Sequence, residues 1–196
     1  MAKPGILDLS PTQFVLGMKE VDFKTQKFKK FSAKELAAYC DDHVIPIVIG
    51  PAKQNFLIDH HHFARACWEN KIDSYKVSVL KDLSHLSEAE FWNFMIKNEW
   101  VYLHDQFGLG EHPPAALPMD IRGLADDPYR SLVWAVIEQG GITKETIPFF
   151  EFKWAAFFRR NLDVKLYVKS DFKSVMPEAL KLCKSVEASH LPGFIK

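Results

Sequence analysis

Cysteine is scarce in this chain, and its copies are far apart. The 196 residues include three cysteines, Cys40, Cys67 and Cys183, and no Cys-x-x-Cys pair. An odd number of widely spaced cysteines argues against a disulfide framework, and no cysteine zinc motif is present. Two of the three fall on apolar faces of expected helices, so we predict reduced thiols in the protein core.

Long apolar runs and targeting signals are also missing. The sequence contains no stretch of about 18 consecutive apolar residues and no basic N-terminal segment followed by an apolar one. These absences argue against a membrane span and a cleaved secretion signal. We therefore expect a cytoplasmic protein that does not contact a membrane.

The chain has no excess of either charge, because 25 Lys and Arg residues balance 25 Asp and Glu residues. Without a global positive field a protein is poorly suited to hold a long polyanion, which argues against sequence-specific DNA binding. Local basic clusters remain, and we interpret them as solvated faces: Lys24, Lys27, Lys29 and Lys30, and Arg159 with Arg160.

Apolar and aromatic residues are plentiful by contrast. Hydrophobic residues make up 47% of the chain and include 16 phenylalanines, enough to bury a substantial core. The order of the expected elements predicts an α+β (mixed α/β) fold, with a small mixed sheet followed by a helical C-terminal half. We expect residues 1–83 to form the sheet core and residues 84–196 a helical extension packed on it as one compact unit.

Three strands are predicted after an extended lead at residues 6–9. Residues 44–49 and 55–58 are continuous apolar runs, and residues 75–80 alternate valines with polar neighbours. The short segment Gly50-Pro51-Ala52-Lys53-Gln54 suits a hairpin between the first two strands. The third strand follows a helix, so it could pair in parallel with a neighbour through a crossover.

Helix starts are marked by two capping boxes, Ser32-Ala33-Lys34-Glu35 and Ser87-Glu88-Ala89-Glu90. Apolar residues follow each box at helical spacing: Leu36, Ala37 and Cys40 after the first, and Phe91, Phe94 and Met95 after the second. Residues 101–124 are rich in Gly and Pro and are expected to form a long ordered loop. Each box should therefore open a helix with one buried stripe.

The C-terminal half carries three further helix patterns. Asp127 is expected to cap a helix with Pro128 at its first position, ended by Gly140-Gly141. Residues 148–160 carry aromatic side chains all round the helix axis, which is typical of a deeply buried helix. Residues 170–189 are expected to form the last helix.

The segment with the most chemistry is Asp59-His60-His61-His62, between the strand at 55–58 and an expected helix. Asp59 stands where a helix N-cap belongs. Unpartnered backbone N–H groups at a helix N-terminus favour an anion, and imidazoles can add donors or positive charge. The pattern therefore predicts a phosphate site.

Two other interpretations of this segment stay open. Asp59 could simply cap the helix while the histidines form a solvated turn. All four side chains could also bind a metal such as zinc, but neighbouring positions on a helix diverge by about 100°, so the histidines cannot converge on one ion without ligands from elsewhere. No His-Glu-x-x-His motif supplies such ligands.

The order of these motifs resembles the ParB/sulfiredoxin superfamily, and specifically its ParB-like nuclease branch. The matching segments are Leu7 to Gln13, Leu36-Ala37, Ile45-Pro46-Ile47-Val48-Ile49 and Phe56 to Ala66. The later segments 126–132 and 150–159 also look like that branch. In the superfamily the last of these segments, residues 56–66 here, is the phosphate-binding turn. It contains Gly-Glu-Arg-Arg in ParB proteins, Gly-Cys-His-Arg in sulfiredoxins and Asp-Gly-His-His-Arg in ADP-dependent free serine kinases.

This chain departs from those turns. His61 and His62 stand where Arg-Arg or His-Arg would be, and the glycine corresponds to Asp59 or His60 depending on the alignment. Histidine supplies less fixed charge than arginine, which disfavours tight triphosphate binding and favours proton transfer. No cysteine occupies the turn, and no helix-turn-helix follows the core, so neither sulfinic acid repair nor operator binding is expected.

The resemblance implies a phosphoryl-chemistry enzyme, a nuclease or nucleotide phosphohydrolase. Asp59 and His60 would bind a nucleotide or nucleic-acid phosphate, His61 and His62 would act as general acid and base, and Arg65 would neutralise developing charge. A divalent ion such as Mg2+ would fit this chemistry, and ATP, ADP or CTP could be the ligand.

The superfamily also places polar groups opposite the phosphate turn, where this chain has Glu20 and Lys24. Glu20 is the candidate general base and Lys24 a phosphate ligand, although the two could equally be a surface pair four residues apart. Asp126, Asp127 and Arg130 are either a helix cap with a structural ion pair or a substrate-side contribution.

Two alternative functions remain. The first is a small-molecule kinase that uses ADP or ATP, like the free serine kinases, in which Glu20 would activate a hydroxyl group. The second is a non-catalytic nucleotide-binding or interaction module, in which the histidines bind phosphate without turnover. Analysis of reaction products distinguishes these functions from hydrolysis.

Overall fold

The computed structural model describes residues 3–163 and 172–195, and it divides into two compact units, Met1–Ala125 and Asp126–Lys196. The sequence suggested a boundary between residues 83 and 84. The boundary lies later because helix α4 (Glu88–Lys97) packs onto the sheet through Phe91 and Met95, in one cluster with Val48 and Phe56. Each unit has its own hydrophobic core.

The N-terminal unit contains a four-stranded mixed sheet in the order β1-β4-β3-β5. Strands β3 (Ile45–Ile49) and β4 (Asn55–Leu57) form the predicted antiparallel hairpin. Strand β5 (Val77–Asp82) pairs with β3 in parallel after a helical crossover, as predicted, and β1 (Leu9–Pro11) pairs in parallel with β4. This sheet and its helices confirm the α+β class.

One short element of this unit, at residues 6–8, differs from the prediction, and another, strand β2, was not predicted. The lead segment is a 3-10 turn, Ile6–Asp8, because the Asp8 carboxylate accepts the backbone N–H of Gly5 at 2.9 Å and closes the turn before β1 begins. Strand β2 (Val15–Leu16) pairs with β6 (Ala125–Asp126) in a separate two-stranded sheet.

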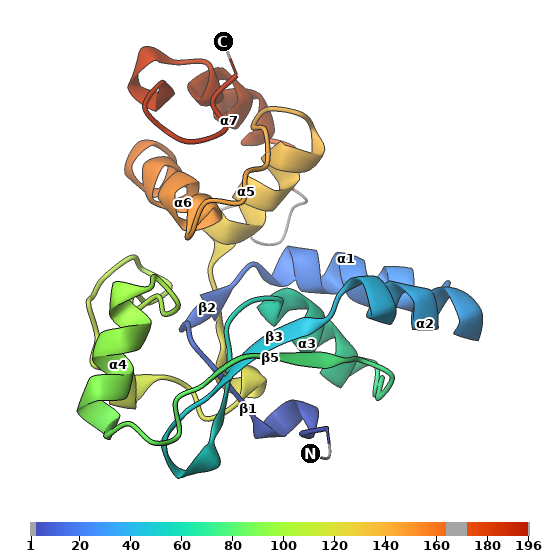
Figure 1. The fold of residues 1–196 in the computed structure, drawn as a ribbon. Helices are drawn as coiled ribbons and strands as arrows, with labels where there is room; N and C mark the ends of the chain where they lie inside the picture. The colour runs from blue at the N-terminus through green and yellow to red at the C-terminus, as the bar shows by residue number, and fades with distance from the viewer. Residues whose placement is uncertain (1–2, 164–171, 196) are drawn as a thin grey trace. The chain divides into compact units, whose positions relative to one another are not determined.

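Helices cover both faces of the four-stranded sheet (Figure 1). On one face Ile47 and Leu57 pack in a cluster with Phe63 of α3 (His61–Glu69) and Val21 of α1 (Met18–Phe28). On the other face lies the cluster that contains α4. Since both faces are buried, the central strands read as continuous apolar runs rather than alternating patterns.

The two capping boxes occur as predicted, at the starts of α4 and of α2 (Ala33–Asp42). The stripe of α2 is narrower than expected, because Cys40 is buried whereas Ala37 is exposed. The Gly- and Pro-rich segment 101–124 is a long connection with two short 3-10 turns, Pro114–Ala116 and Ile121–Gly123.

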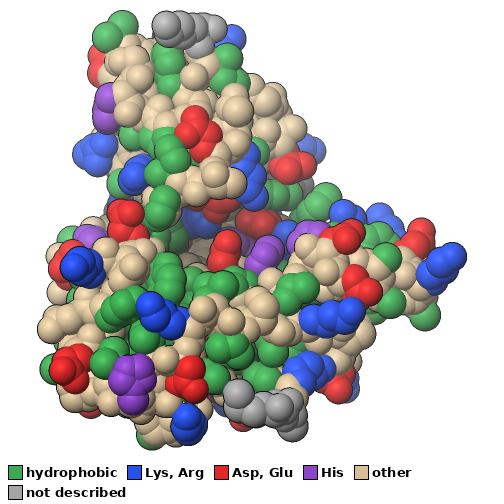
Figure 2. Space-filling view, in the orientation of Figure 1, with side chains coloured by type: hydrophobic (Ala, Val, Ile, Leu, Met, Phe, Trp, Pro, Cys, Tyr) green, Lys and Arg blue, Asp and Glu red, His purple; other side chains and the backbone are tan. Residues whose placement is uncertain are grey.

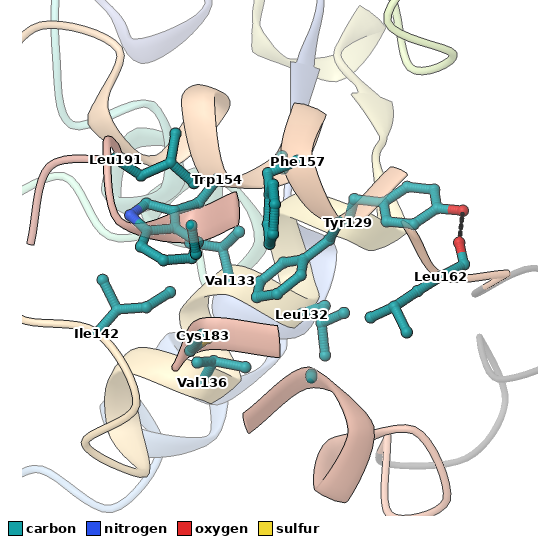
Figure 3. Packing of buried hydrophobic residues seen from close by; sticks show 14 of the residues in the cluster. Tyr129, Leu132, Val133, Val136, Ile142, Trp154, Phe157, Leu162, Cys183 and Leu191 are labelled. Carbon is teal, nitrogen blue, oxygen red and sulfur yellow. Dashed lines mark hydrogen bonds between the residues drawn. The ribbon is translucent and has the colours of Figure 1, made fainter. Parts of the chain in front are cut away.

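The C-terminal unit is helical, with α5 (Pro128–Glu138), α6 (Phe150–Asn161) and α7 (Met176–Cys183). Figure 3 shows its core around Trp154, with the hydroxyl of Tyr129 donating to the carbonyl oxygen of Leu162 at 2.8 Å. Buried aromatic side chains surround the α6 axis, as predicted: Phe150, Phe152, Trp154, Phe157 and Phe158.

The last helix is shorter than the predicted range of 170–189, of which residues 170–171 lie outside the described residues. Pro177 lies in the first turn of α7, where its missing N–H is tolerated, so the helix cannot run through it from further upstream. The helix ends at Cys183, and a separate 3-10 turn follows at Val186–Ala188.

Three findings bear on the compositional expectations. Cys40, Cys67 and Cys183 are buried free thiols, as predicted, and burial raises the pKa of Cys183 to about 12. In the described part of the chain no helix has the length and apolar character that a bilayer span requires. Figure 2 shows blue basic and red acidic side chains interspersed on the face of the N-terminal unit in view, in keeping with the zero net charge.

Candidate functional site

The histidine turn lies between β4 and α3, as the sequence indicated, but its cap differs. His60 is the N-cap of α3 and has a left-handed backbone, with φ 65° and ψ 26°. Asp59 precedes the cap, and its carboxylate accepts the N–H of His60 at 2.6 Å. The prediction that Asp59 caps the helix is therefore wrong, because the left-handed residue takes that place. The side chain of His60 makes no capping hydrogen bond to the helix.

His61 is buried, with 4% of its surface exposed. Its Nε2 accepts the backbone N–H of Thr12 at 3.3 Å, and the hydroxyl of Thr12 donates to the carbonyl oxygen of Leu57 at 2.8 Å. An accepting Nε2 carries no proton. His61 therefore fixes the segment after β1 onto the end of β4.

His62 connects the first turns of two helices. Its Nε2 accepts the backbone N–H of Gly17, the N-cap of α1, at 3.0 Å. Its Nδ1 lies 3.5 Å from Oε2 of Glu20, whose Oε1 lies 3.2 Å from Nζ of Lys24. The structure thus brings Glu20, Lys24 and His62 together.

The cluster is largely sheltered from solvent. The side chains of Glu20, His62 and Lys24 are 12%, 13% and 19% exposed. Burial alone would lower the pKa of Lys24, but the Glu20 carboxylate and the Tyr39 hydroxyl outweigh it, and the pKa of Lys24 is raised. Glu20 and Lys24 are therefore more than a solvated surface pair.

His43 is a neighbour of the turn that the sequence did not single out. Its ring stacks on Tyr39 with centroids 3.8 Å apart and lies 5.9 Å from the ring of His60. The sequence also gave no indication of Thr12 and Gly17. All three residues contact the turn across long separations in the chain. No local pattern could have identified them.

Arg65 is engaged in contacts with other parts of the N-terminal unit. Its guanidinium donates to Glu69 at 2.9 Å and to the carbonyl oxygen of Ile121 at 3.0 Å, and it lies 5.1 Å from the ring of Trp68. These contacts fix α3 to the 3-10 turn at residues 121–123. The structure does not bring Arg65 together with the Glu20 cluster.

Asp127 and Arg130 lie in the C-terminal unit and hold its helices together. Asp127 caps α5 by accepting the N–H of Tyr129 at 2.9 Å, and its other oxygen pairs with Arg159 at 2.5 Å. Arg130 pairs with Glu151 of α6. Burial raises the pKa of Asp127, although Arg159 counteracts it. This geometry fits the cap with structural ion pairs, and Asp126 is an exposed residue of β6.

The described residues contain no group of three or more His, Cys, Asp or Glu side chains placed to hold a metal ion. Mg2+ is commonly bound by one or two carboxylates together with the phosphates of a ligand. The carboxylates nearest the turn are Asp59, within it, and Glu20, beside His62.

Two cavities of the N-terminal unit lie away from the turn. One, of about 580 Å³, is bordered by Phe14, Met119 and the ion pair of Asp120 with Arg122. The other, of about 670 Å³, lies beside the C-terminal half of α3, at Cys67 and Trp68.

Comparison with known proteins identifies the family. The family described as "Putative ParB-like nuclease" matches residues 3–160, which is most of the chain. The chain belongs to this family. The crystal structure of protein Atu1540 from Agrobacterium tumefaciens resembles this ParB-like protein with a TM-score of 0.88 and 36% sequence identity, over 99% of this chain and 97% of that one. A search of curated proteins found no match.

Proposed function

We propose that this ParB-like protein is a phosphoryl-chemistry enzyme, a nuclease or nucleotide phosphohydrolase. It would bind a nucleotide or nucleic-acid phosphate at the turn Asp59-His60-His61-His62, where α3 begins. Family membership supports the reaction class. The position of the turn supports phosphate binding, because a helix N-terminus favours an anion and the His60 side chain makes no capping hydrogen bond there.

The observation that carries the proposal is the cluster of Glu20, His62 and Lys24 beside this turn. Glu20 is the general base of the proposal, and it would take a proton from the attacking water. Lys24 and His62 hold its carboxylate between the first turns of α1 and α3. Positioned acid–base groups typically contribute roughly 10² to 10⁴-fold to a rate.

The histidines divide into two roles in this proposal. Since both Nε2 atoms accept backbone N–H groups, His61 and His62 act chiefly by positioning the segment 12–17 and Glu20. His60 is the N-cap of α3, and in this proposal it faces the phosphate together with Asp59. With Nε2 accepting, a neutral His61 or His62 carries its proton on Nδ1, so the sequence-based role in proton transfer would use that atom.

One observation favours a second candidate, an ADP- or ATP-dependent small-molecule kinase. The left-handed backbone of His60 is a conformation that suits glycine, so Asp59-His60-His61-His62 aligns with the Asp-Gly-His-His of the serine kinase turn. The position of the following arginine in that turn is then Phe63, a core residue with 1% exposure. Kinase and hydrolase would share Glu20 and differ in the acceptor, a hydroxyl group or water.

Incubation with labelled nucleotides and nucleic acids, with and without Mg2+, tests the proposal. Glu20→Gln keeps the size of the side chain but removes the base, and it should lower the rate by roughly 10²-fold or more. Asp22→Asn is the matched control, because Asp22 is an exposed carboxylate on the same helix. The control should keep the wild-type rate.

Each product identifies one function. Shortened nucleic acid or released phosphate supports the hydrolase, and phosphate transferred to an amino acid supports the kinase. Nucleotide that binds but is recovered intact under every condition rules out both enzymes and leaves a binding module. Equal activities of Glu20→Gln and the wild type would remove Glu20 from the mechanism.

A further inference from the structure

The cavity of about 670 Å³ has the size and lining of a small-molecule site. Sites of this kind typically enclose about 300–1,000 Å³ and are mostly apolar with a few polar groups. Here the apolar lining comes from Ile6, Cys67, Trp68, Ile72 and Tyr75. Two of these side chains are aromatic, which suits a flat aromatic ligand.

The wall formed by the N-terminal segment is fixed in place. The hydroxyl of Tyr75 donates to the carbonyl oxygen of Pro4 at 2.8 Å. Nζ of Lys3 lies 2.9 Å from a carboxylate oxygen of Asp73 and 3.9 Å from the centre of the Tyr75 ring. These contacts hold the segment before Gly5 against Tyr75 and so fix one wall of the cavity.

The charges around the cavity leave one cation uncompensated. Glu69 is paired with Arg65 and Asp73 with Lys3, each at 2.9 Å. Lys71 also lines the cavity, and no ion pair of its side chain occurs among the described residues. Lys71 follows the end of α3 and has a left-handed backbone, with φ 54°. Its N–H donates to the carbonyl oxygen of Trp68 at 3.1 Å. Lys71 is exposed, so its ammonium group can reach a ligand at the rim.

We propose that this cavity binds a small aromatic carboxylate. The rings lie against Trp68, Ile72 and Ile6, and the carboxylate pairs with Lys71. The site is on the C-terminal half of α3, whereas the phosphate turn is at the N-terminus of the same helix, so the two sites are separate. The inference does not depend on the enzymatic function.

Titration of the full chain with naphthylacetate and with its neutral amide tests the proposal. Isothermal calorimetry gives the affinities, and the indole N–H resonance of Trp68, assigned with Trp68→Phe, locates the ligand. An exposed ion pair contributes up to about 1 kcal/mol, so the acid should bind about fivefold more tightly than the amide. Lys71→Gln should abolish this preference, whereas Lys97→Gln, an exposed lysine of α4, should keep it.

A second variant tests the location. Ile72→Phe fills the cavity from a half-buried position and should weaken both compounds equally, with the fold checked by circular dichroism. Equal affinities of acid and amide for the wild type, or an unshifted Trp68 resonance during binding, would overturn the proposal. Absence of binding by either compound would overturn it as well.

Discussion

The backbone N–H of Gly17 donates a hydrogen bond to Nε2 of His62 at 3.0 Å. Gly17 is the N-cap of α1 and has no side chain that could cap the helix, while His62 lies in the first turn of α3. The bond therefore joins the beginnings of two helices, and it places Glu20 beside the turn. A histidine that looks like a proton donor in the sequence is here an acceptor that holds the backbone.

Replacement of His61 should destabilise the protein more than a histidine-to-alanine change on the surface. In His61→Ala the buried N–H of Thr12 loses its acceptor, and an unpaired buried donor costs about 1–3 kcal/mol in addition to the lost packing. Urea unfolding measures the loss. The control is His85→Ala, at an exposed position, which should stay within about 0.5 kcal/mol of the wild type. Equal free energies of unfolding for the two variants would contradict the structural role of His61.

The left-handed backbone of His60 predicts that glycine at this position gives a more stable protein than alanine does. A residue with a Cβ atom pays about 1 kcal/mol for this conformation, whereas glycine does not. His60→Gly should therefore be more stable than His60→Ala by about 1 kcal/mol in thermal or urea unfolding. Comparing the two variants cancels the loss of the imidazole contacts with His43 and Phe63. If the alanine variant is the more stable, His60 does not adopt this backbone in solution.

The ion pair of Glu20 and Lys24 predicts a loss of stability in base. The pKa of Lys24 is raised above its ordinary value of 10.5 in the folded protein, so folding favours the protonated form. Its contribution is complete below pH 10.5 and is lost as the pH rises through the raised value. Lys24→Met should cost about 1 kcal/mol at about pH 8 and less at about pH 11.5.

Urea unfolding at the two pH values checks this prediction for Lys24. Lys30→Met is the reference, since Lys30 is exposed and its difference from the wild type should not depend on pH. A constant difference between Lys24→Met and the wild type at both pH values would show that the ion pair with Glu20 does not stabilise the fold.

Loss of Arg159 should destabilise the C-terminal unit through Asp127. The Asp127 side chain is 2% exposed, and Arg159→Met leaves its carboxylate buried without the partner at 2.5 Å. Breaking one partner from a buried pair typically costs about 3–5 kcal/mol. Hydrogen exchange of the α5 amides measures the loss. Adding Asp127→Asn should restore part of the stability, because an uncharged Asn can still cap Tyr129. No recovery in the double variant would argue against this explanation.

Local patterns in the sequence predicted the local structure well. The boxes Ser32–Glu35 and Ser87–Glu90 and the cap at Asp127 occur as expected, because each depends on side chains within three residues of the backbone they bind. The hairpin and the parallel β3–β5 pairing follow from short connections and a single crossover helix.

Contacts between distant residues explain what could not be predicted. The bond of His61 to Thr12 spans 49 positions, and that of His62 to Gly17 spans 45. Nothing local to the histidine turn indicates such partners. The cap at Asp59 was wrong for a related reason, because local preference favours aspartate, whereas the turn leaving β4 places a left-handed residue one position later. The place of Glu20 beside the turn could be predicted only from the resemblance.

The indole N–H of Trp154 donates to the carbonyl oxygen of Pro192 at 2.7 Å. Pro192 lies beyond the end of the family match at residue 160. Much of the apolar surface packed around Trp154 also comes from later residues, including Met176, Ala179 and Leu191. A polypeptide truncated to the family segment would therefore expose the apolar surfaces of α5 and α6. Large exposed apolar patches promote aggregation. Recombinant work on this protein should therefore retain residues 161–196, which lie beyond the end of the family match.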